Sequence, residues 1–288
     1  MTRTGAGHPR SINPYTDLKT ALKRALRATT EERSVNGASS NKWILFPRPN
    51  PAAALRLFCF HHAGGSAQIF RDWIRRLPMS VEMGAIQLPG HGHRLDEPHI
   101  KRMAPLSRIV AQELLPYLDK PFVFFGHSMG ALLCFETARN LRRENQPQPA
   151  HLFVSATAAP HRRIIKESLS GLPKSALIEK LHEFDGAPAE VLQNDELMDL
   201  MLPMLRADFE LFETYEYLPE SPLECSMTIY GGLDDPKVEA ERLAAWRETT
   251  LGACEIRMFP GGHFYFNSSQ AIFLQTFAGD LLRLRLQN

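Results

Sequence analysis

Short apolar runs alternate with longer helical patterns from Trp43 to the C-terminus. The runs lack polar alternation, which is typical of strands buried on both faces of a parallel sheet. Helical periods lie between them, as at residues 131–143 and 238–249. This order predicts an α/β fold with a mostly parallel, doubly wound sheet. The predicted strands are residues 55–60, 81–88, 122–125, 151–155, 227–230 and 256–259.

Residues 160–222 break this alternation, because they contain no clear strand. Their second half has helical spacing, through Leu197, Leu200, Met201, Met204, Leu205, Asp208 and Phe212. Ordinary crossover helices are one interpretation, but a segment of about sixty residues is much longer than a crossover needs. We therefore predict a helical lid inserted between two strands.

Residues 1–41 differ in composition from the rest of the chain, because Thr, Ser, Gly and Arg are common and large apolar residues are few. We expect a flexible extension here and one domain over residues 42–288. Within the extension, residues 17–28 place Leu and Ala on one helical stripe with Lys and Arg opposite. This short amphipathic helix has three open interpretations: a frayed helix, a partner-docking helix or an organelle transit peptide.

Charge and cysteine content narrow the classes of function. Lys and Arg number 33 and Asp and Glu 32, so the formal net charge of +1 excludes nucleic-acid binding driven by bulk positive charge. No run reaches the roughly 18 apolar residues of a membrane span, and the first residues lack the apolar core of a secretory signal. The 4 cysteines form no C-x-x-C pair, which fits a reducing compartment. We expect a cytoplasmic protein.

The strongest chemical signal is a G-x-S-x-G motif, Gly126-His127-Ser128-Met129-Gly130. It stands between a predicted strand and a predicted helix, which is the context of a nucleophile elbow. Its two glycines allow the strand and the helix to approach closely. The N-terminus of the helix offers unpaired N–H groups to an oxyanion. The motif therefore predicts Ser128 as a catalytic nucleophile.

A serine nucleophile needs a base, and the base needs an acid that orients it. In folds with this elbow the partners follow in the order serine, acid, histidine. His263 is the only histidine C-terminal to His182, and it lies in a glycine-flanked loop after a predicted strand. We predict His263 as the base. Asp234 and Asp235 compete for the role of the acid, and spacing alone does not choose between them.

Two Gly-containing loops carry further histidines. Residues 61–66 (HHAGGS) follow the first long predicted strand, where the second oxyanion N–H arises in such folds. Their spacing matches neither of the common phosphate-binding loops. His91 and His93 lie in a Pro- and Gly-containing loop without matching Cys or Asp ligands, so we predict no metal site.

The chain resembles the type II thioesterases, which are stand-alone editing hydrolases of polyketide, nonribosomal peptide and fatty acid assembly lines in the α/β-hydrolase superfamily. The resemblance runs from about Trp43 to the C-terminus, whereas the leader before it has no counterpart. It implies an α/β-hydrolase fold with a helical lid at about residues 160–222. The matching segments are residues 60–66, 88–98, 125–130 and 259–266, with the lid stretch of residues 190–209.

The resemblance also implies roles for individual residues. The family's acid stands three residues after a glycine and directly before Pro-x-Val, a pattern that selects Asp235 and leaves Asp234 in reserve. The oxyanion hole would be formed by the backbone N–H groups of Ala63 and Met129. His62 takes the place of the histidine before Ala-Gly-Gly, to which we assign a structural role.

The implied reaction is hydrolysis of an acyl thioester on the phosphopantetheine arm of an acyl or peptidyl carrier protein, or of an acyl-CoA, through an acyl-enzyme. The chain itself would need no cofactor, because the substrate carries the phosphopantetheine. A carboxylesterase, an acyltransferase and a non-catalytic carrier-binding module are the alternatives. The basic run at residues 162–166 and the leader helix are candidate docking sites for an acidic carrier.

Overall fold

A computed structural model describes residues 41–184 and 189–285 of the chain. The chain divides into two units, Met1–Ser40 and Asn41–Asn288, and every described residue belongs to the second. The predicted amphipathic helix of residues 17–28 lies outside the described residues.

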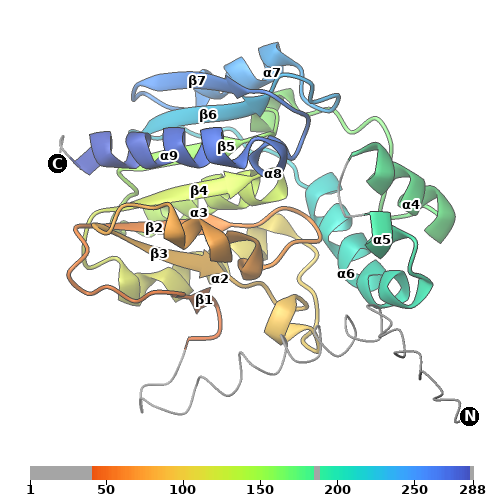
Figure 1. The fold of residues 1–288 in the computed structure, drawn as a ribbon. Helices are drawn as coiled ribbons and strands as arrows, with labels where there is room; N and C mark the ends of the chain where they lie inside the picture. Colours follow the sequence, from red (N-terminus) through yellow and green to blue (C-terminus); the bar gives the residue numbers. More distant parts are fainter. Residues whose placement is uncertain (1–40, 185–188, 286–288) are drawn as a thin grey trace, which may run out of the picture. The chain divides into compact units, whose positions relative to one another are not determined.

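A seven-stranded sheet with the strand order β1-β3-β2-β4-β5-β6-β7 forms the centre of the second unit (Figure 1). All neighbouring strands are parallel except β1, which pairs with β3 in the antiparallel direction. The predicted mostly parallel, doubly wound sheet is therefore confirmed. The strands are β1 Ile44–Leu45, β2 Leu55–Phe60, β3 Val81–Ile86, β4 Phe122–His127, β5 His151–Ser155, β6 Ser226–Gly232 and β7 Cys254–Phe259.

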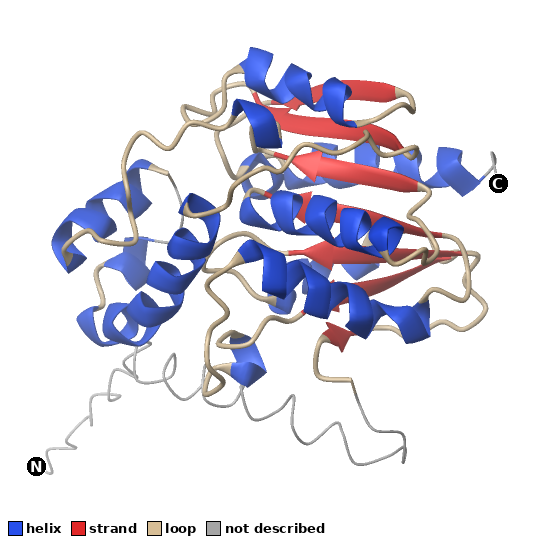
Figure 2. Cartoon of the chain, turned by 180° about the vertical axis from the view of Figure 1, so that it is seen from behind, coloured by secondary structure: helices blue, strands red, loops and turns tan. Residues whose placement is uncertain are grey.

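Helices cover both faces of the sheet (Figure 2). Among the described helices, none is long and apolar enough to cross a membrane. The helical pattern at residues 238–249 becomes an α-helix followed by a 3-10 helix rather than a single helix. The α-helices are α2 Met103–Leu114, α3 Met129–Arg143, α4 Lys174–Glu183, α5 Ala189–Leu192, α6 Asp195–Glu213, α7 Ala240–Ala244, α8 Tyr265–Ser268 and α9 Gln270–Arg285. The 3-10 helices are η2 Ala67–Arg75, η3 Gly92–Arg94, η4 Leu115–Tyr117, η5 Pro160–Arg162 and η6 Ala245–Thr249.

Strand β4 shows why a continuous apolar run forms a central strand. Its alternate side chains point to opposite faces of the sheet. Phe122 and Phe124 join a core with α2 and α3, whereas Val123 and Phe125 join a second core with η2 and α9. Both sets are almost fully buried, so these four positions of the strand all take apolar residues.

The helices α4, α5 and α6 form the predicted lid between β5 and β6, and they gather at one end of the sheet (Figure 1). The lid has an apolar core of its own, to which all three helices contribute: Leu177, Leu181, Leu192, Met198, Leu205 and Phe209. Helix α6 begins after Asn194, whose side-chain oxygen accepts a hydrogen bond from the Leu197 N–H at 3.1 Å.

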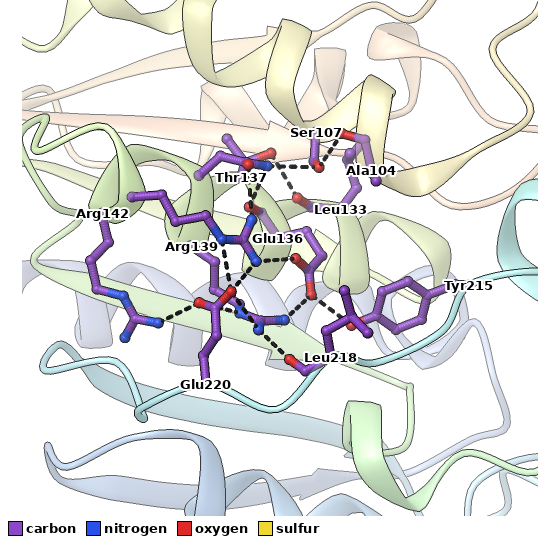
Figure 3. Close-up of polar contacts among 12 residues, drawn as sticks. Ala104, Ser107, Leu133, Glu136, Thr137, Arg139, Arg142, Tyr215, Leu218 and Glu220 are labelled. Carbon is purple, nitrogen blue, oxygen red and sulfur yellow. Dashed lines mark hydrogen bonds and ion pairs between the residues drawn. The ribbon is translucent and has the colours of Figure 1, made fainter.

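An ionic cluster centred on the buried Arg139 ties the end of the lid to helix α3 (Figure 3). The Arg139 guanidinium, only 2% exposed, pairs with Glu136 on its own helix and with Glu220 at 3.1 Å. It also donates to the Leu218 carbonyl, and the Tyr215 hydroxyl donates to Glu136 at 2.7 Å. Because residues 214–222 lead from α6 back to β6, this cluster fixes the exit of the lid on the helix that follows Ser128.

Candidate active site

Ser128 lies at a sharp turn between β4 and α3, at the carboxyl edge of the sheet. Its φ of 54° and ψ of −116° form a conformation that L-residues rarely adopt. Its N–H donates to the Ser155 carbonyl at 2.8 Å, which ties the turn to the neighbouring strand. A Cβ on Gly126 would lie 2.3 Å from the Gly130 carbonyl oxygen, and one on Gly130 would lie 2.3 Å from that of Phe60. Only glycine fits at these two positions.

His263 and Asp235 meet on the loops that follow β7 and β6. The His263 Nδ1–H donates to Asp235 Oδ2 over 2.8 Å, and both side chains are buried. Asp234, the alternative acid, is exposed, and its N–H donates to the Gly261 carbonyl at 3.0 Å. Of the two predicted aspartates, Asp235 is the one in contact with His263.

Burial is the largest influence on His263 and lowers its pKa from the ordinary value of 6.5. The hydrogen bond and charge of Asp235 oppose this shift, whereas the Lys237 ammonium adds to it. The net result is an imidazole that is neutral at neutral pH, the form that accepts a proton.

Ser128 and His263 line the same cavity of about 50 Å³. Ala63 belongs to its wall, and the lid supplies most of the apolar remainder: Leu181, Phe184, Leu192, Met198, Met201, Leu205 and Phe209. A second cavity of about 280 Å³ also contains Ala63, Ser128 and His263, together with Met129. It extends to the segment of residues 163–169, so the site opens in two directions from Ser128.

A chain of hydrogen bonds that we did not predict connects the residues beside Ser128 and His263. His127 Nδ1 and Ser155 Oγ are 2.7 Å apart, and Ser155 Oγ and the Tyr265 hydroxyl are 2.6 Å apart. The His127 ring packs against His263 with ring centroids 5.1 Å apart. Because all of these side chains are buried, the chain fixes the loop of His263 against the strand before Ser128.

A family model described as a thioesterase domain matches residues 55–281. The chain belongs to the thioesterase family. It is therefore a hydrolase that acts on thioesters, with the α/β-hydrolase architecture described above.

Similar proteins come from biosynthetic pathways. The thioesterase is 40% identical to linear gramicidin dehydrogenase LgrE of Brevibacillus parabrevis, with 81% of this chain and 89% of LgrE covered. It is 41% identical to the gramicidin S biosynthesis protein GrsT of Aneurinibacillus migulanus, with 80% and 90% covered. The solved structure of BorB, a type II thioesterase from the borrelidin biosynthetic cluster, is 33% identical with a TM-score of 0.77, covering 87% of this chain and all of BorB's.

The histidine-containing loops of the thioesterase pack together beside the site. His61 lies with its ring centroid 4.9 Å from that of His91, which is buried and contacts Asp208. The His62 Nδ1–H donates to the Ala63 carbonyl at 2.9 Å and its ring packs on Phe264. Within residues 41–184 and 189–285, no group of three or more His, Cys, Asp or Glu side chains is placed to hold a metal ion.

Asp208 is a second residue of the thioesterase site that we did not predict. It lies on α6 with 4% of its surface exposed, and its carboxylate contacts the loop that contains Ala63. The sequence holds a signal for it, because this acid interrupts the apolar stripe of the lid helix between Leu205 and Phe212. An acid on a buried stripe requires a partner, but sequence spacing does not identify that partner.

The basic run predicted as a docking site divides into an inward and an outward part. The Arg163 guanidinium donates to the Phe212 carbonyl at 2.6 Å and lies 4.2 Å from the centroid of that ring. Arg163 therefore helps to fix the end of α6, and its role in carrier docking stays a prediction. Arg162 and Lys166 are exposed, and Arg162 lies 3.6 Å from Glu248.

Proposed function

We propose that this thioesterase removes acyl groups from the phosphopantetheine arm of acyl or peptidyl carrier proteins, with Ser128, His263 and Asp235 as its catalytic triad. The observation that carries the proposal is the 2.8 Å contact between His263 Nδ1 and Asp235 Oδ2, beside a cavity that His263 shares with Ser128. A base oriented in this way keeps Nε2 for the serine proton.

In the first step Ser128 Oγ attacks the thioester carbonyl while His263 accepts the hydroxyl proton. The bond from carbon to sulfur then breaks, and His263 protonates the leaving thiolate. In the second step His263 takes a proton from water, which attacks the acyl-enzyme. His263 then gives that proton to Ser128 Oγ as the ester bond breaks and the acid is released. Asp235 holds the imidazole in one tautomer and stabilises its charge. No cofactor bound by this chain takes part in these steps.

The negative charge of the tetrahedral intermediate would lie between the N–H groups of Ala63 and Met129. Met129 is the first residue of α3, where backbone N–H groups have no acceptor within the helix and the helix dipole favours an anion. Ala63 borders both cavities at Ser128. One such donor contributes roughly 3 kcal/mol to lowering the barrier.

The two cavities suit the two ends of the substrate. The smaller one, under the lid, has a largely apolar wall and would accept the acyl group. The other extends from Ser128 to Ile164, Ile165 and Lys166, which are exposed, so it would admit the phosphopantetheine arm. An acidic carrier docked at this opening would meet the positive charges of Arg162 and Lys166.

The biological setting is proposed from the relatives. LgrE and GrsT are named for gramicidin pathways and BorB for the borrelidin cluster, which supports a role in editing or release on a polyketide or nonribosomal peptide assembly line. Thioesterases of fatty acid synthases are also similar in sequence. The word dehydrogenase in the name of LgrE has no counterpart in the G-x-S-x-G chemistry of this chain. Four free cysteines favour a reducing compartment, and we propose the cytoplasm.

A matched pair of substrates tests the proposal. We expect kcat/KM for an acyl-pantetheine thioester to exceed that for the oxygen ester with the same acyl group, and both activities to disappear in Ser128→Ala. Ser269→Ala is the control, because its hydroxyl bonds to Pro260 on the exterior of the same region. Preference for the oxygen ester would favour a carboxylesterase. Transfer of the acyl group to an added alcohol or amine in preference to water would favour an acyltransferase.

A further inference from the structure

One carboxylate oxygen of the lid joins three segments of the thioesterase. Asp208 Oδ2, on α6, accepts the backbone N–H of Gly64 at 2.7 Å and contacts Nε2 of His91 at 2.9 Å. Gly64 follows β2, and His91 lies in the loop after β3. The lid helix is thus bonded directly to the two loops at the carboxyl edge of the sheet.

Gly64 directly follows Ala63, whose N–H is the proposed oxyanion donor. The loop is a tight turn, in which the Gly65 N–H donates to the His62 carbonyl at 3.0 Å. Gly64 has a φ of +77°, and Leu205 Cδ2 of the lid lies 2.6 Å from the position that a Cβ on Gly64 would take. The turn is therefore held from α6 by a polar contact and an apolar contact, three residues apart on one helix face.

The hydrogen-bond partners of His91 determine the protonation state of the His91–Asp208 pair. The Nδ1–H of His91 donates to the Pro89 carbonyl at 2.9 Å, and Nε2 faces the carboxylate. Both partners are acceptors, so both ring nitrogens carry protons and the pair is an imidazolium with a carboxylate. Burial opposes the charge on His91, but the charge and hydrogen bond of Asp208 raise its pKa above the ordinary value.

Two further histidines pack on this pair without sharing its charge. The ring centroids of His61 and His99 lie 4.9 and 6.0 Å from that of His91. Burial lowers the pKa of His61 to about 3, and burial also lowers the pKa of His99. The Asp208 carboxylate therefore faces one cation, His91, and one backbone donor, Gly64, from these loops.

We propose that Asp208 is a positioning residue that holds Gly64 and, through it, the adjoining Ala63 N–H in the geometry of the oxyanion hole, so that seating of the lid helix and assembly of the hole are one event. Asp208 does not line either cavity at Ser128 and would act only through the loop. The inference rests on the proposed role of Ala63. It adds that the lid contributes to stabilising the transition state as well as enclosing the acyl group.

The test combines turnover with a mimic of the tetrahedral intermediate. For Asp208→Ala we expect kcat to fall roughly 100-fold, the order of loss that a misplaced site causes, while KM changes little. Inhibition by butylboronic acid, which forms a tetrahedral anion on the serine, should weaken by a similar factor. Asp208→Asn keeps an oxygen that accepts the Gly64 N–H, the bond that holds the loop, and should keep kcat within about tenfold of the parent.

Arg206→Ala is the matched control from the same helix. The Arg206 guanidinium donates to the carbonyls of Ser170 and Leu172 at 2.7 and 2.6 Å, and so ties α6 to another part of the lid. We expect this variant to keep the parent's affinity for butylboronic acid. If Asp208→Ala does not fold, Asp208→Glu replaces it, since the extra methylene displaces the carboxylate; we expect kcat and boronate affinity to fall together.

Four results would overturn the inference, the last of which is an Asp208→Ala enzyme that is fully active. One is a loss of kcat in Asp208→Ala or Asp208→Glu with unchanged boronate affinity. Another is an Asp208→Asn enzyme as poor as Asp208→Ala. The third is an equal loss of boronate affinity in Arg206→Ala. Ser128→Ala separates this question from the proposed function: if that variant keeps its turnover the triad is wrong, whereas an inactive Ser128→Ala beside a fully active Asp208→Ala refutes only the positioning role.

Discussion

Among its described residues the thioesterase contains two buried His–Asp pairs, which differ in which ring nitrogen faces the acid. In the first, Asp235 contacts Nδ1 of His263 at 2.8 Å. In the second, Asp208 contacts Nε2 of His91 at 2.9 Å, and Nδ1 is bonded to a carbonyl. Residue types, distances and burial are almost the same. The pairs differ in whether the ring nitrogen that faces away from the acid is available to exchange a proton with a reactant.

That difference separates proton transfer from positioning. Burial lowers the pKa of His263, and its Nε2 would exchange a proton with Ser128. His91 has both nitrogens engaged, and Asp208 raises its pKa in spite of burial, so it keeps its charge and holds a loop in place. The hydrogen-bond partners of the ring, rather than the His–Asp pair itself, decide the role.

Substitution of Asn for each of the two aspartates should give the largest difference in kcat between the pairs. We expect Asp235→Asn to lower kcat by roughly 10⁴-fold, because the imidazole loses the tautomer and the charge stabilisation that catalysis needs. Asp208→Asn should cost less than about tenfold, because its oxygen still accepts from Gly64. Steady-state kinetics on one acyl-pantetheine substrate measures kcat for both variants. Equal losses of kcat would contradict different roles for the two pairs.

The lid contacts of the second pair also depend on how the lid is anchored. Arg139→Met should lower the free energy of unfolding by about 3–5 kcal/mol, because it removes the nearest cation of the buried Glu136 carboxylate and leaves it only Arg143 at 3.8 Å. Lys42→Met removes an exposed pair with Glu97 and should cost less than about 1 kcal/mol. Urea unfolding measures both. A similar small cost for each would mean that the cluster in Figure 3 does not anchor the lid.

The pH dependence of stability should identify the charged pair. His91 has a raised pKa, so its contribution is complete below the unfolded value of about 6.5 and is lost as the pH rises through the folded value. Asp208 has a lowered pKa, so its contribution is lost only in acid, as the pH falls below 3.8 through the folded value. The difference in unfolding free energy between the parent and His91→Gln should therefore be largest from about pH 4 to 6.5. A difference that grows toward alkaline pH would contradict the ion pair.

The smallest expected effect is on the acid limb of activity. With His263 as the proposed neutral base and its pKa lowered, kcat/KM should rise with pH and level off with a midpoint below 6.5. Asp208→Asn should leave this midpoint in place, because Asp208 is not among the groups that shift His263. A midpoint above 6.5 in the parent enzyme would argue against His263 as the base.

The sequence was sufficient for most of the fold because apolar runs and helical periods are local signals. Strands β2 and β5 match the predicted residues 55–60 and 151–155. Strand β1 was missed because two residues, Ile44 and Leu45, are too short to show a period. The predicted helix of residues 238–249 was too long, because α7 ends at Ala244 and the 3-10 helix η6 that follows directly has a similar sequence pattern.

The residues of the candidate site also divide into those that local sequence signals predict and those that they do not. Ser128 and His263 stand in local motifs, so they were predicted from spacing, and the structure places Asp235 rather than Asp234 against His263. Asp208 depends on a contact with Gly64 that spans 144 positions of the chain. No local pattern specifies such a contact, which arises only when the lid helix packs against the end of the sheet.

The acyl-enzyme tests the central claim most directly. We expect rapid acid quenching during turnover of an acyl-pantetheine thioester to yield protein heavier by one acyl group, and peptide mass spectrometry to place that group on Ser128. The Ser128→Ala protein should carry no acyl group and release no acid. Continued release of acid by Ser128→Ala, or an acyl group located on another residue of the parent enzyme, would contradict the account.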